Sequence, residues 1–155
     1  MIGILIVAHG AFGEALIHSA SHVLGKRPLR VRQLGLTVHD DPEAILGAKQ
    51  ARVATLGVSR SDDPDKVLAR ARQLAAQLDE GAGVLVLTDM FGATPGNVAA
   101  RLLADGRVEG VSGVSLPMLV RVLSARNGSL PAAVQRALSG GAEGVVHMNT
   151  DRCGG

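Results

Sequence analysis

The sequence has almost no aromatic residues: it contains no Trp, no Tyr and only two Phe among 155 residues. It therefore lacks the aromatic platforms on which bases stack, which argues strongly against the single-strand nucleic-acid modules that depend on them. An aromatic cage for methylated amines is excluded for the same reason. Apolar residues nevertheless make up 46% of the chain, too many for a disordered protein. We therefore expect a folded domain with an aliphatic core.

Long apolar runs, paired cysteines and a strong excess of one charge are also missing. No run approaches the roughly 18 residues that can span a bilayer, and the single Cys153 cannot form an internal disulfide. The 16 basic and 14 acidic residues leave a net charge of +2, and the scattered basic residues argue against a nucleic-acid partner. No basic segment precedes the first apolar run, so no signal peptide is predicted. We expect a cytoplasmic protein.

The length fits one domain, which we expect over residues 1–148, followed by a flexible tail at residues 149–155. Apolar runs suited to strands occur at residues 2–8, 29–36, 84–88, 108–114 and 144–148. Helical patterns occur at residues 11–24, 64–78, 92–103, 117–125 and 130–138. Strands that alternate with helices predict an α/β fold, with a mostly parallel β-sheet and helices on both faces.

A tandem repeat lies within a duplicated segment at about residues 30–73. Residues 30–46 resemble residues 52–68 at an offset of 22 positions, and each copy carries Leu-Gly followed by Asp-Asp-Pro. Asp-Pro is a favourable start for a helix, and two copies are too few for a solenoid. We predict that the second copy lies directly before the strand at residues 84–88. The first copy is then an extra helix or excursion.

Two residues that follow predicted strands could form a nucleophilic site. His9 follows the first apolar run and Asp89 follows the run at residues 84–88, so both lie at the sheet edge where ligands bind in parallel α/β folds. A carboxylate there can accept the Nδ1 proton of an imidazole and leave Nε2 as the nucleophile. Taken singly, His9 is equally well explained as a residue that ends a strand, and Asp89 as an ordinary loop or cap residue.

The segment FGATPGN at residues 91–97 is a candidate anion cradle. Gly92 allows close approach of the backbone, and the free N–H groups of Ala93 and Thr94 at a helix start favour an anion. A phosphoryl group would therefore fit a cradle made by Phe91, Gly92, Ala93 and Thr94. Taken alone, a plain Thr-Pro helix cap is the simpler interpretation. Walker and G-x-G-x-x-G motifs are absent, so the phosphoryl group would come from a donor protein.

The remaining histidines give weaker patterns. Glu14, His18 and His22 share one face of the first predicted helix at a spacing that can bind a metal. That face is opposite the apolar stripe, so a solvated surface is the simpler interpretation. His39 and His147 have no ligand at a suitable spacing. We predict neither a metal site nor a cofactor.

Three segments, in this order and spacing, carry a resemblance to a known family. They are ILIVAHGAFGEAL at residues 4–16, GVLVLTDMFGATPGNVAARLL at residues 83–103 and VSGVSLPMLVRVL at residues 111–123. Over almost its whole length the chain resembles the mannose-type enzyme IIA component of the bacterial phosphoenolpyruvate-dependent sugar phosphotransferase system (PTS). The resemblance implies a phosphotransferase: the carrier protein HPr donates a phosphoryl group to Nε2 of His9, and a IIB protein accepts it.

Other expectations also come from this resemblance. Asp89 and Thr94 match family positions beside the phosphoryl group, and Asn97 matches an Asn of the following helix. Pro117 and Met118 match a segment near the rim of the active site. Relatives usually form homodimers in which the last strand is exchanged, which would here be an antiparallel edge strand at residues 144–148. Association with the membrane would be indirect, through IIC and IID proteins.

The sequence departs from the family at Met90 and Ala93, where relatives can have Thr or Gly, and in the duplicated segment, which has no recognised family counterpart. We also expect no fused IIB domain. Three alternatives stay open: a regulatory protein controlled by phosphorylation of His9, the phosphotransferase subunit of a dihydroxyacetone kinase, and an anion or nucleotide binder that uses residues 91–97 without catalysis. The sequence does not identify a sugar.

Overall fold

The computed structural model describes residues 1–25, 35–36 and 52–149. Within these residues the sheet has five strands in the order β2-β3-β1-β4-β5, and each neighbouring pair is parallel. The strands are β1 (Gly3–His9), β2 (Gly35–Leu36), β3 (Val53–Val58), β4 (Val84–Thr88) and β5 (Val108–Ser112). The helices are α1 (Phe12–Val23), α3 (Pro64–Leu78), α4 (Thr94–Ala100), α5 (Leu116–Ala125) and α6 (Leu130–Glu143).

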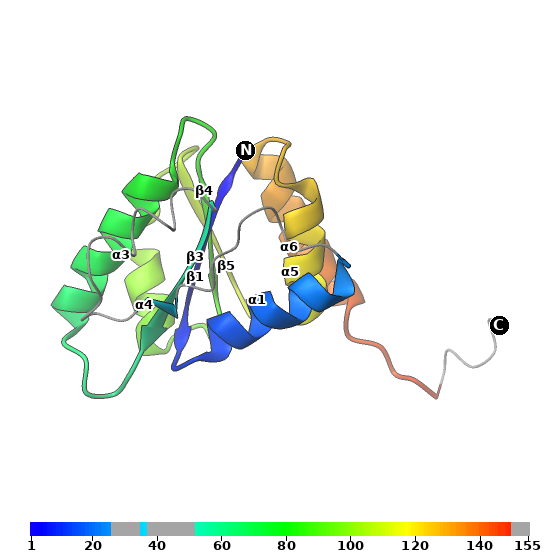
Figure 1. Ribbon diagram of the computed structural model, residues 1–155, viewed down its shortest axis with the longest axis horizontal. Helices are drawn as coiled ribbons and strands as arrows, with labels where there is room; N and C mark the ends of the chain where they lie inside the picture. The colour runs from blue at the N-terminus through cyan, green and yellow to red at the C-terminus, as the bar shows by residue number, and fades with distance from the viewer. Residues whose placement is uncertain (26–34, 37–51, 150–155) are drawn as a thin grey trace.

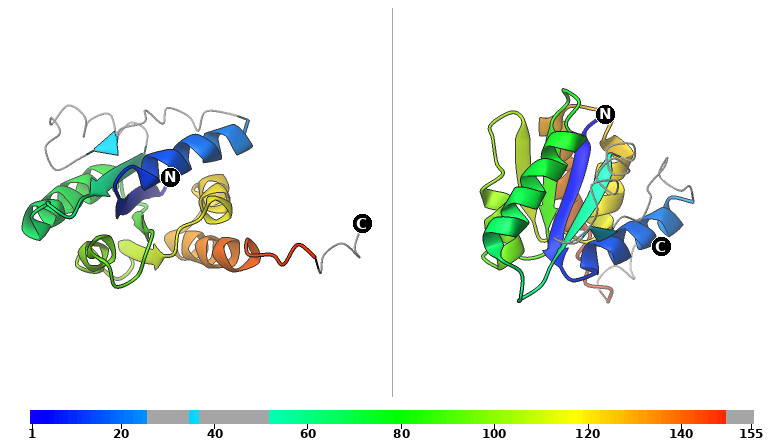
Figure 2. Two further views of the ribbon diagram at one scale, coloured as in Figure 1. Left: turned by 90° about the horizontal axis from the view of Figure 1, so that it is seen from below. Right: turned by 60° about the vertical axis from the view of Figure 1, so that its left-hand side comes forward.

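The sheet is the middle layer of three (Figure 1). Helices α3 and α4 cover one face, and α1, α5 and α6 cover the other, as the two further views also show (Figure 2). Because helices that connect parallel strands must cross over the sheet, both faces become covered. The α/β fold with a parallel sheet and helices on both faces is therefore confirmed.

Strand β1 supplies the centre of two aliphatic clusters. Leu5 and Val7 pack on the α3 and α4 side, whereas Ile4 and Ile6 pack on the side of α1, α5 and α6. Successive side chains of a strand point to opposite faces, so a strand buried on both faces needs an unbroken apolar run. The aliphatic core is confirmed among the described residues, since both Phe side chains are exposed.

The helix starts follow the predicted chemistry in one case and depart from it in another. The Asp63 carboxylate accepts a hydrogen bond from the Asp65 N–H at 2.9 Å and caps α3, as the Asp-Pro pattern predicts. At α4 the cap position is Ala93, with Thr94 as the first helical residue. The prediction of a Thr94 cap is therefore wrong, because Thr94 itself has already entered the helix.

The two copies of the repeat contribute to neighbouring positions in the sheet. β3, from the second copy, pairs with β1, and α3 follows it and leads to β4, as predicted. β2, from the first copy, pairs with the outer side of β3. The predicted strand at residues 29–36 is seen only as Gly35–Leu36, and the rest of the first copy lies outside the described residues.

The predicted strand at residues 144–148 is absent from this single chain. α6 ends at Glu143, and residues 145–148 form neither helix nor strand. Their apolar side chains Val145, Val146 and Met148 are exposed. A strand needs a neighbouring edge with which to form hydrogen bonds, and these residues have none here. Exchange of this segment in a dimer stays a prediction, and the predicted tail lies almost wholly outside the described residues.

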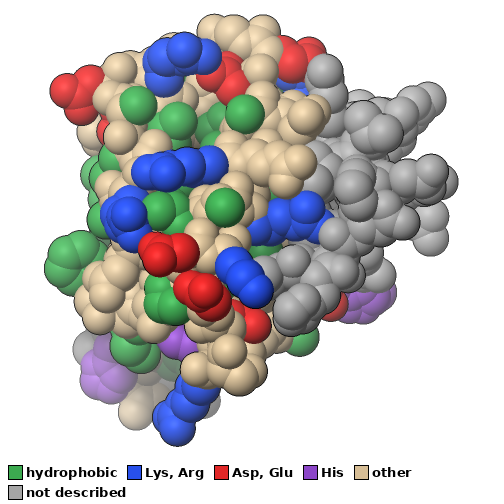
Figure 3. Space-filling model, turned by 90° about the vertical axis from the view of Figure 1, so that its left-hand side faces the viewer, with side chains coloured by type: hydrophobic (Ala, Val, Ile, Leu, Met, Phe, Trp, Pro, Cys, Tyr) green, Lys and Arg blue, Asp and Glu red, His purple; other side chains and the backbone are tan. Residues whose placement is uncertain are grey.

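The surface on the α3 side carries mixed charge. Lys and Arg side chains are interspersed there with Asp and Glu side chains (Figure 3). No field of one sign extends over this face, which agrees with the scattered basic residues of the sequence. In the described part of the chain, no helix is long and apolar enough to cross a membrane.

Candidate active site

His9 lies at the exit of the central strand. It is the last residue of β1, and its side chain is 51% exposed. Gly10 follows with a positive φ of 53°, a conformation that glycine adopts without steric cost, and the chain turns from there into α1. The Gly10 N–H donates to the Val58 carbonyl at 3.1 Å. The histidine is therefore held by the sheet on one side and open to solvent on the other.

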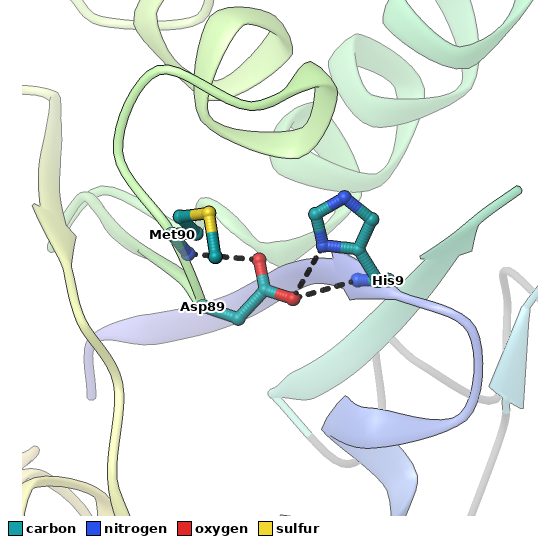
Figure 4. A network of polar contacts seen from close by, with 3 residues as sticks. All are labelled: His9, Asp89 and Met90. Carbon is teal, nitrogen blue, oxygen red and sulfur yellow. Dashed lines mark hydrogen bonds and ion pairs between the residues drawn. The ribbon is translucent and has the colours of Figure 1, made fainter. Parts of the chain in front are cut away.

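Asp89 is the partner of this histidine. It follows β4, which pairs with β1 in parallel, so the carboxyl ends of the two strands lie side by side. The Asp89 Oδ2 atom lies 2.7 Å from His9 Nδ1 and also accepts the His9 backbone N–H at 3.0 Å. Its other oxygen accepts the Met90 N–H at 2.9 Å. Figure 4 shows these three contacts and the second ring nitrogen of His9 pointing away from the carboxylate.

The surroundings of Asp89 favour its ionised form. Burial raises the pKa of this carboxyl. The hydrogen bonds from the His9 N–H, the His9 ring and the Met90 N–H, together with the charge of the His9 ring, lower the pKa by more than burial raises it. The net result is a pKa below the ordinary value. Since an ionised carboxylate only accepts hydrogen bonds, Nδ1 of His9 must carry the hydrogen. In the neutral form of the ring, Nε2 then has a free lone pair that points away from the carboxylate.

Residues 91–94 form the turn between Asp89 and α4. Gly92 has a φ of 81°, and Phe91 and Thr94 are exposed. In the described part of the chain, the N–H groups of Phe91, Gly92 and Thr94 donate no hydrogen bond. Unpaired N–H groups at the start of a helix attract anions. The turn lies next to the His9 and Asp89 pair, and the binding of a phosphoryl group by residues 91–94 stays a prediction.

Gly96 supports this turn, a role that the sequence analysis missed. A Cβ at this position would lie 2.7 Å from the Met90 carbonyl oxygen, a distance that real side chains do not tolerate. The glycine lets the turn fold directly against the start of α4. The signal was present in the sequence as the Gly of TPGN, but a glycine in a helix gives no hint of which backbone it approaches.

The remaining predicted residues lie in other surroundings. Asn97 is exposed in the first turn of α4. Pro117 and Met118 lie in the first turn of α5, where both are approached by glycines at the end of α6.

The histidine pair of α1 forms a ring contact and no metal cluster. The rings of His18 and His22 meet edge to face with centroids 5.0 Å apart, and both residues are exposed. Over residues 1–25, 35–36 and 52–149, no group of three or more His, Cys, Asp or Glu side chains could hold a metal ion. His147 lies in the exposed segment after α6, and His39 is outside the described residues.

Comparison with known proteins gives one consistent result. Residues 39–138 match the family model described as "PTS system fructose IIA component". The chain is 42% identical over 73 residues to the PTS system mannose-specific EIIAB component of Escherichia coli K12, an overlap of 45% of this chain and 23% of that protein. It is 52% identical over 44 residues to the PTS system fructose-specific EIIA component of Bacillus subtilis, or 28% and 30% of the two chains.

Solved structures with the same fold extend the match to nearly the whole chain. The phosphotransferase system component EIIA of Streptococcus agalactiae aligns with a TM-score of 0.71 at 24% identity, covering 97% of this chain and 99% of that one. A PTS IIA protein associated with the fucose utilization operon of Streptococcus pneumoniae aligns with a TM-score of 0.71 at 23% identity, covering 96% and 94%. In sequence, the chain spans less than a third of the length of the curated relatives named above.

Proposed function

The chain belongs to the family of PTS system fructose IIA components, and from this premise we propose that it is a phosphocarrier whose phosphoryl group is bound to His9. The family match covers residues 39–138 and so includes Asp89 and the turn but not His9. The observation that carries the proposal is the 2.7 Å contact between His9 Nδ1 and the Asp89 carboxylate. This contact leaves Nε2 of His9 as the nucleophile.

The proposed step is an in-line transfer between two histidines. Nε2 of His9 attacks the phosphorus of a phosphohistidine on the donor protein, the donor N–P bond breaks, and its electron pair stays on the donor imidazole. His9 keeps its hydrogen on Nδ1 and becomes cationic. The ionised Asp89 stabilises that charge at hydrogen-bond distance. Phosphoryl transfer of this kind depends mainly on positioning and electrostatics.

The turn after Asp89 supplies hydrogen-bond donors for the transferred group. The backbone N–H groups of Phe91, Gly92, Ala93 and Thr94 bind the phosphoryl oxygens, and the Thr94 hydroxyl adds one more donor. Backbone N–H groups suit this task because they are held in place before the reaction and need no reorganisation as charge shifts on the phosphoryl oxygens. The phosphoryl group must leave again, since a carrier both accepts and donates it.

We propose HPr as the donor and a IIB protein as the acceptor, in the cytoplasm, with membrane association only through IIC and IID. A homodimer is proposed with the exposed segment at residues 144–148 as its exchanged strand. The regulatory function, the dihydroxyacetone kinase subunit and the simple anion binder remain alternatives. Binding of partner proteins to the phosphorylated and unphosphorylated chain separates the first from a carrier, and acid-labile phosphate on His9 would argue against simple anion binding.

The decisive experiment is a phosphorelay with phosphoenolpyruvate, purified enzyme I and HPr. We expect His9→Ala to abolish uptake of phosphate, because the nucleophile is removed. His22→Ala is the matched control: it removes an exposed histidine of α1 and should label like the wild type. Undiminished labelling of His9→Ala would refute the assignment.

The role of Asp89 is tested by Asp89→Asn in the same relay. A hydrogen bond to a charged group contributes about 1.5–3 kcal/mol, so we expect transfer to slow by about 10- to 150-fold. The variant should stay folded with a modest loss of stability, because the lowered pKa of Asp89 means that its ionised form also stabilises the fold. An unchanged transfer rate would remove Asp89 from the mechanism.

A further inference from the structure

The loop between β3 and α3 is an ordered turn at the same sheet edge as His9. The Asp62 N–H donates to the Ser59 carbonyl at 3.2 Å, and the Asp62 carboxylate accepts the Ser59 N–H at 2.8 Å. The hydroxyls of Ser59 and Ser61 lie 3.0 Å apart. Arg60 is therefore a central residue of a turn that is closed by three polar contacts, and it lies at the tip of that turn.

This turn begins directly beside His9. β3 and β4 lie on opposite sides of β1, so the exit of β3 flanks His9 on the side away from Asp89. Val58 pairs with His9 in register, and the Gly10 N–H donates to the Val58 carbonyl. Arg60 follows Val58 by two residues. Arg60 therefore lies one strand away from His9, at the same edge of the sheet.

Arg60 has no counter-charge among the residues that the structure describes. It is exposed and makes no ion pair or hydrogen bond in the part of the chain that the structure describes. Four other arginines, by contrast, each pair with a carboxylate: Arg52, Arg101, Arg107 and Arg121. The nearest anions along its own loop are already engaged, since Asp62 closes the turn and Asp63 caps α3.

We propose, building on the function proposed above, that Arg60 binds the phosphoryl group while it is attached to His9. That group carries a charge of about −1.5 to −2 near neutral pH, and the ionised Asp89 lies on the far side of the ring. A guanidinium offers paired donors that match phosphoryl oxygens. The group would then lie between the backbone N–H groups of the turn at residues 91–94 and the side chain of Arg60.

The two copies of the repeat differ at the position of Arg60. Arg60 belongs to the second copy, and the equivalent position of the first copy, 22 residues earlier, is Val38. The two copies are therefore not interchangeable at this position. The copy that brings a cation to the sheet edge is the one whose strand lies against β1.

The test uses the full chain phosphorylated by phosphoramidate, a small donor that needs no protein docking. The phosphorus-31 chemical shift of phosphohistidine is followed against pH in the wild type, Arg60→Gln and Arg60→Lys. A cation at about 5 Å stabilises the dianionic phosphoryl group, so Arg60→Gln should raise the midpoint of its second titration by about 0.5 pH units. Arg60→Lys should keep most of the wild-type value. Arg136→Gln, which removes an exposed arginine of α6, is the matched control.

The outcomes separate this proposal from the function on which it rests. A midpoint in Arg60→Gln equal to that of the wild type, with His9 phosphorylated in both, overturns the role of Arg60 and leaves the phosphocarrier function standing. An equal rise in Arg136→Gln also overturns it, because the effect would then be one of net charge. Failure of the wild type to accept phosphate on His9 overturns the phosphocarrier function and this proposal together.

Discussion

Two aspartates of this chain are kept ionised by backbone N–H groups at the ends of secondary structure. Asp89 serves the candidate site, whereas Asp79, at the end of α3, serves the fold. The Asp79 carboxylate accepts the N–H groups of Gly81 and Gly83 at 2.9 and 3.2 Å and the Arg107 guanidinium at 2.9 Å. Asp79 thus stabilises the loop after α3 by hydrogen bonds, whereas Asp89 orients the imidazole of His9.

The pKa of Asp79 predicts how stability changes with pH. The Gly81 N–H lowers this pKa most; burial opposes it, and Arg107 and the Gly83 N–H lower it further, to a value below the ordinary 3.8. A carboxyl with a lowered folded pKa stabilises the fold above its unfolded pKa and loses that contribution as the pH falls. We therefore expect Asp79→Asn to lower the free energy of unfolding by about 1–2 kcal/mol at about pH 7.

The difference between Asp79→Asn and the wild type should be complete at about pH 7 and should shrink as the pH falls below the ordinary 3.8 toward the lowered pKa of folded Asp79. Urea unfolding over this pH range measures it. Asp105→Asn changes an exposed aspartate and should leave stability almost unchanged. A deficit of Asp79→Asn that is independent of pH would show that ionisation of Asp79 does not contribute.

The residues of the site differ in how far the sequence could predict them. His9 and Asp89 follow unbroken apolar runs, so the rule that parallel strands present their carboxyl ends at one edge brings them together. Their contact in the structure agrees with that expectation. Gly96 and Arg60 could not be found in this way. Their importance depends on which backbone or strand exit lies next to them, and that information is absent from the local sequence.

At the scale of elements, the start of α3 is the clearest case in which local chemistry decides the structure. Asp63 caps the helix and Pro64 begins it, where a missing N–H costs nothing. We expect Asp63→Ala to destabilise the fold by about 1 kcal/mol, measured by thermal unfolding. Asp63→Ser keeps a capping oxygen and should lose only a fraction of that amount. Equal losses in both variants would contradict the capping role.

Helix α6 is longer than its sequence predicts because of packing between helices. The pattern ends at residue 138 before the pair Gly140 and Gly141, yet the helix continues to Glu143. A Cβ on Gly140 would lie 2.9 Å from the Met118 Cα, and one on Gly141 would lie 2.9 Å from the Met118 side chain. Close approach to α5 outweighs the low helix propensity of glycine.

The strand predicted at residues 144–148 does not form in the single chain, because here the packing partner is missing. An apolar run shows that a segment can be buried, but it does not supply the neighbour that buries it. In the single chain the segment has no strand beside it and stays exposed. The outer strand β5 is flanked by β4 on one side only within the described sheet.

At the scale of the whole molecule, these two features support the proposed dimer. A sheet edge with free hydrogen-bonding groups and an exposed apolar segment are both liabilities in a monomer. We expect the full chain to sediment as a dimer and a chain shortened after Glu143 to sediment as a monomer. Val23→Ser, which removes an exposed apolar side chain of α1, is the control and should stay dimeric. A shortened chain that remains dimeric would exclude the segment as the exchanged strand.

The pairing of His9 with a residue 80 positions away also has a consequence during synthesis. The ribosome adds about 5–20 residues per second, so the histidine is made about 4–16 s before the aspartate that orients it. Until β4 has been synthesised and has paired with β1, the nascent chain presents an imidazole without its carboxylate. Competence for the proposed transfer therefore arises late in translation, and only in chains that have already closed the centre of the sheet.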